Sequence, residues 1–285
     1  MSVLNTKILF LNGEERPAND VLFTPYNRSF RYGDGVFESM RLVNGKLVFA
    51  QRHLARLMAG INLLQMRLPD NFISCSLEDW CNKLAIRNGV TAGARLRLSV
   101  FRNDGGHYNP QVNDASWLLE IWALEDNEYV LNDIGLSIDL YQDIRKPINK
   151  LSTLKTANAQ LYILAALYSK KMNVSNAILI NHIGNVIEAT NANLFAVKNG
   201  VLYTCPLAEG CVAGVMRAVI MEIATENRIA VYEVPLPLSI LLNSDELFLT
   251  NVTSGLQWVS SYKAKTYSAD TAKKLLVLLN KKIKS

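Results

Sequence analysis

The chain has 285 residues, of which 49% are hydrophobic and 19% are charged. This composition is typical of a soluble globular protein with enough apolar material for one large domain or two of ordinary size. The formal net charge is +5 and no long basic run is present. Nucleic-acid binding is therefore not indicated, whereas small anionic substrates are compatible with the charge.

The first 17 residues contain no long apolar stretch and no small-residue cleavage site. We therefore expect neither a signal peptide nor a membrane span, and we predict a cytoplasmic protein. The four cysteines form no CxxC pair and the three histidines are scattered. This pattern argues against a metal site and favours free thiols in a reducing cytosol.

The first half of the chain predicts alternating strands and helices. Asn44-Gly45 between alternating apolar residues predicts a hairpin, and Ser76-Leu77-Glu78-Asp79 resembles a capping box that begins a helix. A polar loop at 103–110 is of the kind that often lines a binding site. The expected strands are 8–12, 95–102 and 116–123, and the expected helices are 50–66 and 76–88.

A polar break at 125–128 predicts a domain boundary. We expect an N-terminal domain over 1–122, a linker over 123–133 and a C-terminal domain over 134–285. The second half predicts a meander of short strands with turns at Gly184-Asn185 and Asn199-Gly200. The expected strands are 134–140, 177–181, 186–190, 194–197, 201–204 and 246–250, and the expected helices are 157–168, one from the loop 210–217 to about Asn227, and 268–282.

Lys155 stands just ahead of the expected helix 157–168, which is apolar on all sides. A helix of this kind is expected in a core. A lysine at its positive end, partly desolvated, would favour the neutral amine that forms a Schiff base. The alternative is a lysine that extends its stem into water. Lys146 and Lys150 lie close by in the sequence and remain alternative candidates.

Three further features accompany this lysine. Glu188 falls within the apolar meander, where a carboxylate needs a partner. Arg56 lies on the expected helix 50–66, and the glycine-containing loop 210–217 leads into a helix whose free N–H groups suit an anion. Pyridoxal 5'-phosphate needs a lysine for its aldehyde, a carboxylate for its pyridine nitrogen, and cations or N–H groups for its phosphate.

At these positions the chain resembles the class IV aminotransferases, which are fold type IV pyridoxal phosphate enzymes. The resemblance covers nearly the whole chain. It rests on segments in a fixed order: Tyr32-Gly33-Asp34-Gly35-Val36-Phe37-Glu38, His53-Leu54-Ala55-Arg56-Leu57, Lys155 with Asn158, Glu188-Ala189-Thr190-Asn191-Ala192-Asn193-Leu194-Phe195, and Gly214-Val215-Met216-Arg217.

The resemblance implies an α/β fold of two domains, with a smaller N-terminal domain and a barrel-like C-terminal domain that carries most cofactor contacts. It implies that the cofactor lies between the domains and that two copies form a homodimer with the active site near the interface. It makes Lys155 the catalytic, Schiff-base residue. The other implied cofactor-binding residues are Arg56, Glu188, Asn193, Val215, Met216, Asn251 and Val252.

Members of this family carry out three chemistries: transamination of branched-chain amino acids, transamination of D-amino acids, and aminodeoxychorismate lysis. Met216 and Val252 stand where transaminases usually have threonines. Asn251-Val252 and the loop 102–108 are similar to the corresponding lyase segments. Glu38, in contrast, is shared with transaminases. We therefore predict 4-amino-4-deoxychorismate lyase of the folate pathway, with an amino-acid aminotransferase as the alternative.

The substrate would be a small molecule with amine and carboxylate groups. Arg102 could bind its carboxylate, although a surface charge at a strand end is an equal alternative for this residue. Phe37 and His107 are the other candidate substrate-binding residues. A non-catalytic pyridoxal-binding protein is a third hypothesis, but such a protein would have lost the lysine or the glutamate, and both are present.

Overall fold

The computed structural model describes residues 8–284 and forms two compact units. Unit 1 extends to Glu128 and also includes Leu154–Asn158, whereas unit 2 comprises Tyr129–Thr153 and the chain from Ala159 onwards. The division between Glu128 and Tyr129 falls within residues 123–133. The short segment 154–158 is therefore part of unit 1, although its neighbours in the chain belong to unit 2.

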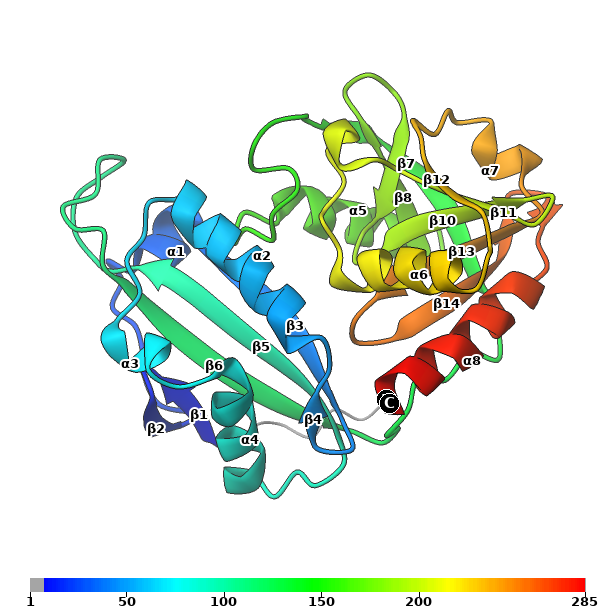
Figure 1. Ribbon diagram of the computed structural model, residues 1–285. Helices are drawn as coiled ribbons and strands as arrows, with labels where there is room; N and C mark the ends of the chain where they lie inside the picture. Colours follow the sequence, from blue (N-terminus) through cyan, green and yellow to red (C-terminus); the bar gives the residue numbers. More distant parts are fainter. Residues whose placement is uncertain (1–7, 285) are drawn as a thin grey trace. The chain divides into compact units, whose positions relative to one another are not determined.

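Unit 1 is built on a six-stranded antiparallel sheet (Figure 1). The strand order is β2-β1-β6-β5-β3-β4. The predicted hairpin is confirmed, because Asn44 and Gly45 both have positive φ angles, 49° and 71°, as a two-residue turn of this type requires. The strands are β1 (Ile8–Leu11), β2 (Glu14–Pro17), β3 (Gly35–Val43), β4 (Lys46–Leu47), β5 (Gly93–Arg102) and β6 (Ala115–Leu124).

Two longer helices complete the core of unit 1. The helix α2 buries Leu57 and Ile61, and α4 buries Leu84, in one hydrophobic core with the sheet. The predicted cap of α4 is confirmed, since Ser76 Oγ accepts a hydrogen bond from the Asp79 N–H at 3.1 Å. The helices of this unit are α1 (Arg28–Tyr32), α2 (Ala50–Leu63), α3 (Asp70–Ile73) and α4 (Leu77–Arg87).

Unit 2 contains a closed barrel of six strands. The ring runs β10-β13-β14-β7-β8-β9 and returns to β10 through the pairing of Asn193 with Glu188. Closure leaves these strands without an open edge and encloses an apolar core. The strands are β7 (Leu136–Lys146), β8 (Asn176–Asn181), β9 (Val186–Ala189), β10 (Asn193–Lys198), β11 (Val201–Thr204), β12 (Val231–Glu233), β13 (Glu246–Asn251), β14 (Gly255–Tyr262) and β15 (Lys265–Thr266).

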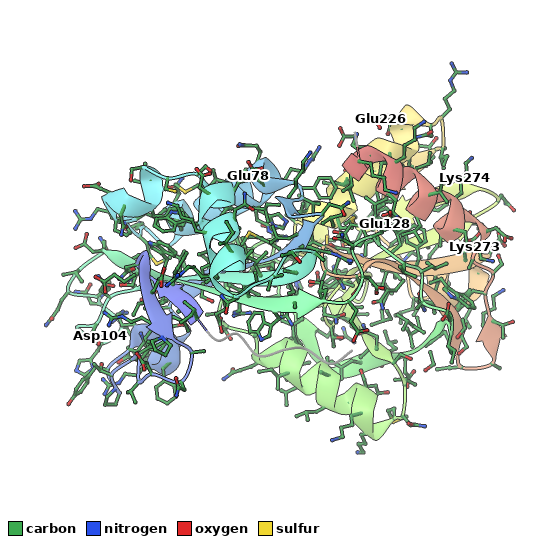
Figure 2. The ribbon with its side chains drawn as sticks, turned by 90° about the horizontal axis from the view of Figure 1, so that it is seen from below. Glu78, Asp104, Glu128, Glu226, Lys273 and Lys274 are labelled. Atoms are coloured by element: carbon green, nitrogen blue, oxygen red, sulfur yellow. The ribbon has the colours of Figure 1, made fainter. Side chains whose placement is uncertain are left out.

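Helices pack around this barrel. The predicted helices after the loop 210–217 and near the C-terminus are confirmed as α6 and α8. Figure 2 shows Glu226 at the end of α6 and Lys273 and Lys274 on α8. The helices are α5 (Gln160–Lys171), the 3₁₀ turn Leu207–Glu209, α6 (Val215–Glu226), α7 (Ile240–Asn243) and α8 (Asp270–Lys284).

The expectation of a core helix at 157–168 is wrong. The helix α5 begins at Gln160, and only Ala165 and Ser169 are buried, while Ile163 and Leu167 are each 57% exposed. The residues just ahead of it are not helical, and Thr156 forms an isolated bridge with Val36 of β3. Lys155 is therefore five residues from the helix and does not lie at its positive end.

The strand β7 is longer than predicted. It begins at Leu136 and continues to Lys146, whereas the sequence indicated 134–140. The extension places Lys146 on the barrel, in parallel pairing with Asn181 of β8. An alternative Schiff-base candidate in the sequence thus becomes a buried residue of a strand.

Across residues 8–284, no helix combines the length and the apolar character that crossing a bilayer requires. The expectation of no signal peptide concerns residues 1–17, of which 1–7 lie outside the described residues. In the same described range, no group of three His, Cys, Asp or Glu side chains could hold a metal ion.

Candidate active site

Glu188 on β9 is enclosed by protein, with 2% of its surface exposed. Its Oε1 accepts hydrogen bonds from Lys146 Nζ at 2.6 Å and from Tyr162 Oη at 2.9 Å. Its Oε2 accepts one from the backbone N–H of Val212 at 2.7 Å. Because a carboxylate offers about four acceptor positions, Oε2 retains one for a further donor.

Lys146 and Tyr162 reach this carboxylate from different elements. Lys146 Nζ also donates to the Ser152 carbonyl at 2.8 Å and lies 5.4 Å from the centroid of the Tyr162 ring. Burial, reinforced by the charge of Glu188, raises the pKa of the Tyr162 phenol. Tyr162 therefore stays protonated at neutral pH and remains a donor.

The N-terminus of α6 supplies free N–H groups shortly after the loop that contacts Glu188. The helix begins at Val215 with Gly214 as its N-cap, and Val212, which donates to Glu188, stands just before that cap. The first-turn N–H groups have no partner within the helix and suit an anion. The side chains of Val215 and Met216 are buried, so the backbone is what this segment can offer.

Asn193 fixes the loop that leads into α6. Its Nδ2 donates to the Val212 carbonyl at 2.9 Å, and a Cβ at position 214 would overlap Asn193 Oδ1. Only glycine therefore fits beside this amide. Asn193, predicted to bind the cofactor, is placed directly against the predicted phosphate loop.

The loop after β13 lies in the same unit. Thr250 pairs with Asn193 across β13 and β10, and its buried Oγ1 has no hydrogen-bond partner among the described residues. Asn251 Oδ1 accepts from the Ser254 N–H at 2.8 Å, and the Val252 carbonyl accepts from Tyr129 Oη at 2.6 Å. These contacts hold the turn in shape, and cofactor binding by Asn251 and Val252 stays a prediction.

Lys155 is held by β3 of unit 1. Its carbonyl accepts from the Phe37 N–H at 2.8 Å, and the Ala157 N–H donates to the Gly35 carbonyl at 2.8 Å. Its Nζ lies 4.5 Å from the centroid of the Phe37 ring, and Arg97 Cζ lies 3.8 Å from that centroid. Lys155 and Phe37, both predicted site residues, are thus neighbours.

Arg97 is a residue that the sequence reasoning missed. Burial lowers the pKa of its guanidinium, Arg95 adds to this, and Glu120 opposes it. The sequence offered one signal. Arg97 lies in a predicted strand, two residues from both Arg95 and Ser99, and alternate residues of a strand share a face, so these three polar side chains belong on one side of the sheet. The sequence does not show that Phe37 and Lys155 lie on the same face as Arg97. That neighbourhood follows from the pairing of β3 with β5.

Arg56, predicted to bind the cofactor phosphate, forms a two-point contact with Glu38. Arg56 Nε donates to Glu38 Oε1 at 2.7 Å and Nη2 donates to Oε2 at 2.5 Å, while His53 Nδ1 lies 2.7 Å from Oε2. Burial opposes ionisation of Glu38, but the hydrogen bonds and charges of Arg56 and His53 outweigh it and lower the pKa of this carboxyl. The phosphate-binding role of Arg56 stays a prediction.

Arg102, the candidate for the substrate carboxylate, is buried and bonded on all three nitrogens. It donates to Asp34 Oδ2, Asn113 Oδ1 and the Leu64 carbonyl at 2.9, 2.5 and 2.5 Å. Substrate binding by Arg102, still a prediction, would require it to release one of these partners.

His107 is exposed in the predicted polar loop, whose Asp104 is labelled in Figure 2. Arg28 Nη1 donates to the carbonyls of Gly105 and His107, at 2.9 and 2.6 Å. The loop is thus held by its backbone, which leaves the His107 side chain available for the predicted substrate contact.

The residues of unit 2 fit pyridoxal phosphate. The spare acceptor position on Glu188 suits a pyridine N–H, and the glycine-lined N-terminus of α6 suits a phosphate. The Thr250 hydroxyl, which no described residue engages, is one more donor for the phosphate. None of these features depends on a metal or another cofactor.

Comparison with known proteins identifies the family. Residues 35–262 match the model of the family described as amino-transferase class IV. The chain belongs to the class IV aminotransferase family. Its members are pyridoxal-phosphate-dependent enzymes, so the predicted family, enzyme class and cofactor are confirmed.

Sequence relatives within this family carry different activities in their names. A putative branched-chain-amino-acid aminotransferase of Methanocaldococcus jannaschii is 29% identical over 86% of this chain and 84% of its own. A D-alanine aminotransferase of Staphylococcus aureus is 27% identical over 86% of both chains. An aminodeoxychorismate lyase of Vibrio harveyi is 28% identical over 84% of this chain and 86% of its own.

Solved structures show the same fold. A branched-chain aminotransferase from the thermophilic archaeon Thermoproteus uzoniensis, solved with norvaline, gives a TM-score of 0.85 at 21% identity, covering 97% of this chain and 96% of its own. A putative 4-amino-4-deoxychorismate lyase of Legionella pneumophila gives 0.80 at 23% identity, covering 93% and 96%. The predicted fold type IV architecture with a barrel is confirmed.

Proposed function

We propose that this enzyme is a 4-amino-4-deoxychorismate lyase, which releases 4-aminobenzoate and pyruvate and serves folate biosynthesis. The observation that carries the proposal is the apolar character of Met216 and Val252, which are 1% and 7% exposed. The resemblance places threonines of transaminases at these positions, so two side-chain hydroxyls for the phosphate are lacking.

A physical reason connects this lack to lysis. A transaminase must retain its aminated cofactor, which has no covalent bond to the protein, until a second substrate arrives. Only noncovalent contacts, with those to the phosphate among the strongest, hold it during that time. A lyase returns the cofactor to its lysine at the end of every turnover and therefore tolerates a weaker hold on the phosphate.

In the proposed reaction, bound pyridoxal phosphate supplies the electron sink. Lys155 Nζ takes the proton from the amine-bearing carbon of the substrate. Glu188, with its remaining acceptor position on Oε2, would hold the pyridine nitrogen. The C–O bond to the enolpyruvyl group at the β position then breaks, the substrate ring becomes aromatic, and the released enolpyruvate takes up a proton to give pyruvate.

Substrate recognition in the proposal involves Arg97 besides Phe37, His107 and Arg102. Arg97 is partly desolvated and stacks on the same Phe37 ring that Lys155 contacts. A guanidinium that has lost much of its hydration gains more than an exposed one by pairing with a carboxylate. We therefore place a substrate carboxylate at Arg97, ahead of the fully bonded Arg102.

An amino-acid aminotransferase is the second candidate. Glu38, which the resemblance shares with transaminases, is buried and tightly paired, and relatives of 27–29% identity include both D-alanine and branched-chain enzymes. In this reaction the proton taken by Lys155 Nζ would be delivered to the cofactor carbon.

In the deciding experiment, purified enzyme is incubated with 4-amino-4-deoxychorismate in the absence of a 2-oxo acid. Formation of 4-aminobenzoate and pyruvate in equal amounts, over many turnovers, is the expected result. Branched-chain and D-amino acids serve as controls and should leave the visible band of the bound cofactor unchanged. Loss of that band with an amino acid, restored by a 2-oxo acid, would establish the aminotransferase instead.

We further propose a cytoplasmic homodimer. The apolar side chains of Ile163, Leu164 and Leu167 form one exposed stripe on α5, and such a stripe favours a protein interface. Sedimentation of the wild-type protein and of Leu167→Lys would test it. The variant should dissociate at concentrations at which the wild type remains dimeric.

A further inference from the structure

Lys146 has no part in the reaction described above, although it makes the shortest contact to Glu188. Its Nζ lies 2.6 Å from Glu188 Oε1, and the side chains of Lys146 and Glu188 are 8% and 3% exposed. Two opposite charges buried at this distance form a strong pair. Removing one of them leaves the other without compensation in a nonpolar environment.

Among the described residues, the surroundings of Glu188 offer no substitute cation in direct contact. Tyr162 Oη and the Val212 N–H are neutral donors. Cys205 and Cys211 lie close enough to Glu188 for its charge to raise the pKa of each thiol, and the charge of Arg217 lowers the pKa of both. Arg217 itself is committed to the Cys205 carbonyl and to Glu233, at 2.6 and 2.5 Å. Among the described residues, Lys146 is therefore the cation in direct contact with Glu188.

Lys146 also ties Glu188 to the segment that leads into Lys155. Its second hydrogen bond goes to the Ser152 carbonyl, and the carbonyl of the next residue, Thr153, accepts from the Ala213 N–H at 2.8 Å. One ammonium thus joins the carboxylate to the chain three residues before Lys155. It orients the carboxylate as well as compensating its charge.

We propose that Lys146 is a positioning residue that keeps Glu188 ionised, so that Glu188 can hold the pyridine nitrogen of the cofactor in its protonated form. The proposal rests on pyridoxal phosphate binding and is independent of the choice between lyase and aminotransferase. Without Lys146, the buried carboxylate would take up a proton. A neutral carboxyl cannot stabilise a pyridinium, and the electron sink would weaken.

The readout is the pH midpoint of the visible band of the lysine-bound cofactor. A protonated pyridine nitrogen disfavours the proton on the nearby Lys155 nitrogen, because like charges repel. Loss of the pyridine proton in Lys146→Met should therefore move the midpoint upwards by about one pH unit, the lower end of what a nearby charge produces. The affinity for added pyridoxal phosphate should fall about tenfold, the equivalent of one such unit.

A double-mutant cycle separates a role through Glu188 from a direct effect of charge. Glu188→Gln should shift the midpoint in the same direction as Lys146→Met. Adding Lys146→Met to Glu188→Gln should give little further shift, since the carboxylate through which Lys146 acts is already gone. Additive shifts, an unchanged midpoint or a downward shift in Lys146→Met would each overturn the proposal.

Control variants guard against misfolding and nonspecific effects. Lys146→Arg retains the charge and should keep the midpoint within a few tenths of the wild-type value. Lys150→Met removes an exposed lysine from the loop that follows β7 and should leave the midpoint unchanged. If Lys146→Met does not fold, Lys146→Gln replaces it, because glutamine can donate to Glu188 but carries no charge.

The outcomes also distinguish this proposal from the cofactor assignment. A wild-type protein that gives no visible band with pyridoxal phosphate would overturn both. A normal wild-type band with a Lys146→Gln midpoint equal to that of the wild type would overturn the role of Lys146 alone.

Discussion

Two buried glutamates, one in each unit, illustrate two uses of the same side chain. Glu38 is bound by the fork of Arg56 and by His53, both from the single helix α2. Glu188 is bound by Lys146, Tyr162 and the Val212 N–H, which come from three separate segments. A guanidinium is permanently charged and matches both carboxylate oxygens, whereas a lysine contacts one oxygen and can lose its proton.

This difference suggests that Glu38 contributes to the stability of the fold, whereas Glu188 contributes to ligand binding. Glu38 joins α2 to β3 through a fixed charge, which is the arrangement expected of a structural cross-link. Glu188 has three partners, but Tyr162 and the Val212 N–H are neutral donors, and the remaining acceptor position on Oε2 lies beside the loop that leads into α6, which is the arrangement expected of a ligand-binding carboxylate. The following substitutions test this distinction, from the largest expected effect to the smallest.

Lys155→Ala should have the largest effect. The substitution removes the amine that we propose bonds the cofactor and moves the proton, so turnover should fall by more than about 10³-fold. The visible band should disappear from the absorption spectrum after pyridoxal phosphate is added. Lys150→Ala is the matched control, and a normal band in Lys155→Ala would place the Schiff base elsewhere.

Glu188→Gln should lower turnover by roughly 10²–10³-fold, the effect of losing one electrostatic contact that supports the developing charge. The amide cannot stabilise a protonated pyridine nitrogen. Steady-state rates with and without excess cofactor measure this loss. If Glu38→Gln, compared at equal cofactor saturation, lost as much activity as Glu188→Gln, the proposed division of roles would be contradicted.

Glu38→Gln should instead destabilise the fold, by about 3 kcal/mol, because it removes the buried counter-charge of Arg56. Urea-induced unfolding measures the change. Asp114→Asn, which breaks an exposed pair with Arg67, is the control and should cost less than about 1 kcal/mol. Equal losses in the two variants would show that burial of the Glu38 pair contributes nothing.

The same carboxyl predicts a pH dependence. Its pKa in the folded state lies below the ordinary value of 4.5, so its contribution to stability is present above that pH. The contribution is lost as the pH falls through the folded-state pKa. Wild-type stability should therefore decline below about pH 4.5 more steeply than that of Glu38→Gln, as thermal unfolding at stepwise pH would show. Parallel pH profiles would contradict this origin.

Glu226→Gln should have the smallest effect. Glu226, visible at the end of α6 in Figure 2, accepts from Lys282 at 2.8 Å, but half of its side chain is exposed. Solvent screens such a pair, and we expect a change below about 0.5 kcal/mol in the free energy of unfolding. A change as large as that of Glu38→Gln would remove the distinction between buried and exposed pairs.

Local patterns in the sequence were sufficient for much of the fold. The turn at Asn44-Gly45 and the cap at Ser76 were predicted because each depends on a few adjacent residues. The meander from 177 to 204 was predicted for the same reason, since its strands are short, apolar and separated by turn residues.

The site was predicted less completely. Lys155 and Glu188 could be chosen from their motifs, but the helix after Lys155 was placed in a core where the structure has an exposed α5. An apolar composition does not say which face meets the barrel and which remains open. Lys146 was only an alternative candidate for the Schiff base and Arg97 had no predicted role, because their partners lie 42 and 60 residues away in the chain.

The sequence by itself determined the family and the cofactor and singled out Lys155 as the predicted reactive lysine, since these depend on residue types at fixed intervals. The tertiary structure decided which charges meet. The pairing of β7 and β9 with the same strand, β8, brings Lys146 to Glu188, and the pairing of β3 with β5 brings Arg97 to Phe37. Such contacts join residues that are remote along the chain, and no local pattern specifies them.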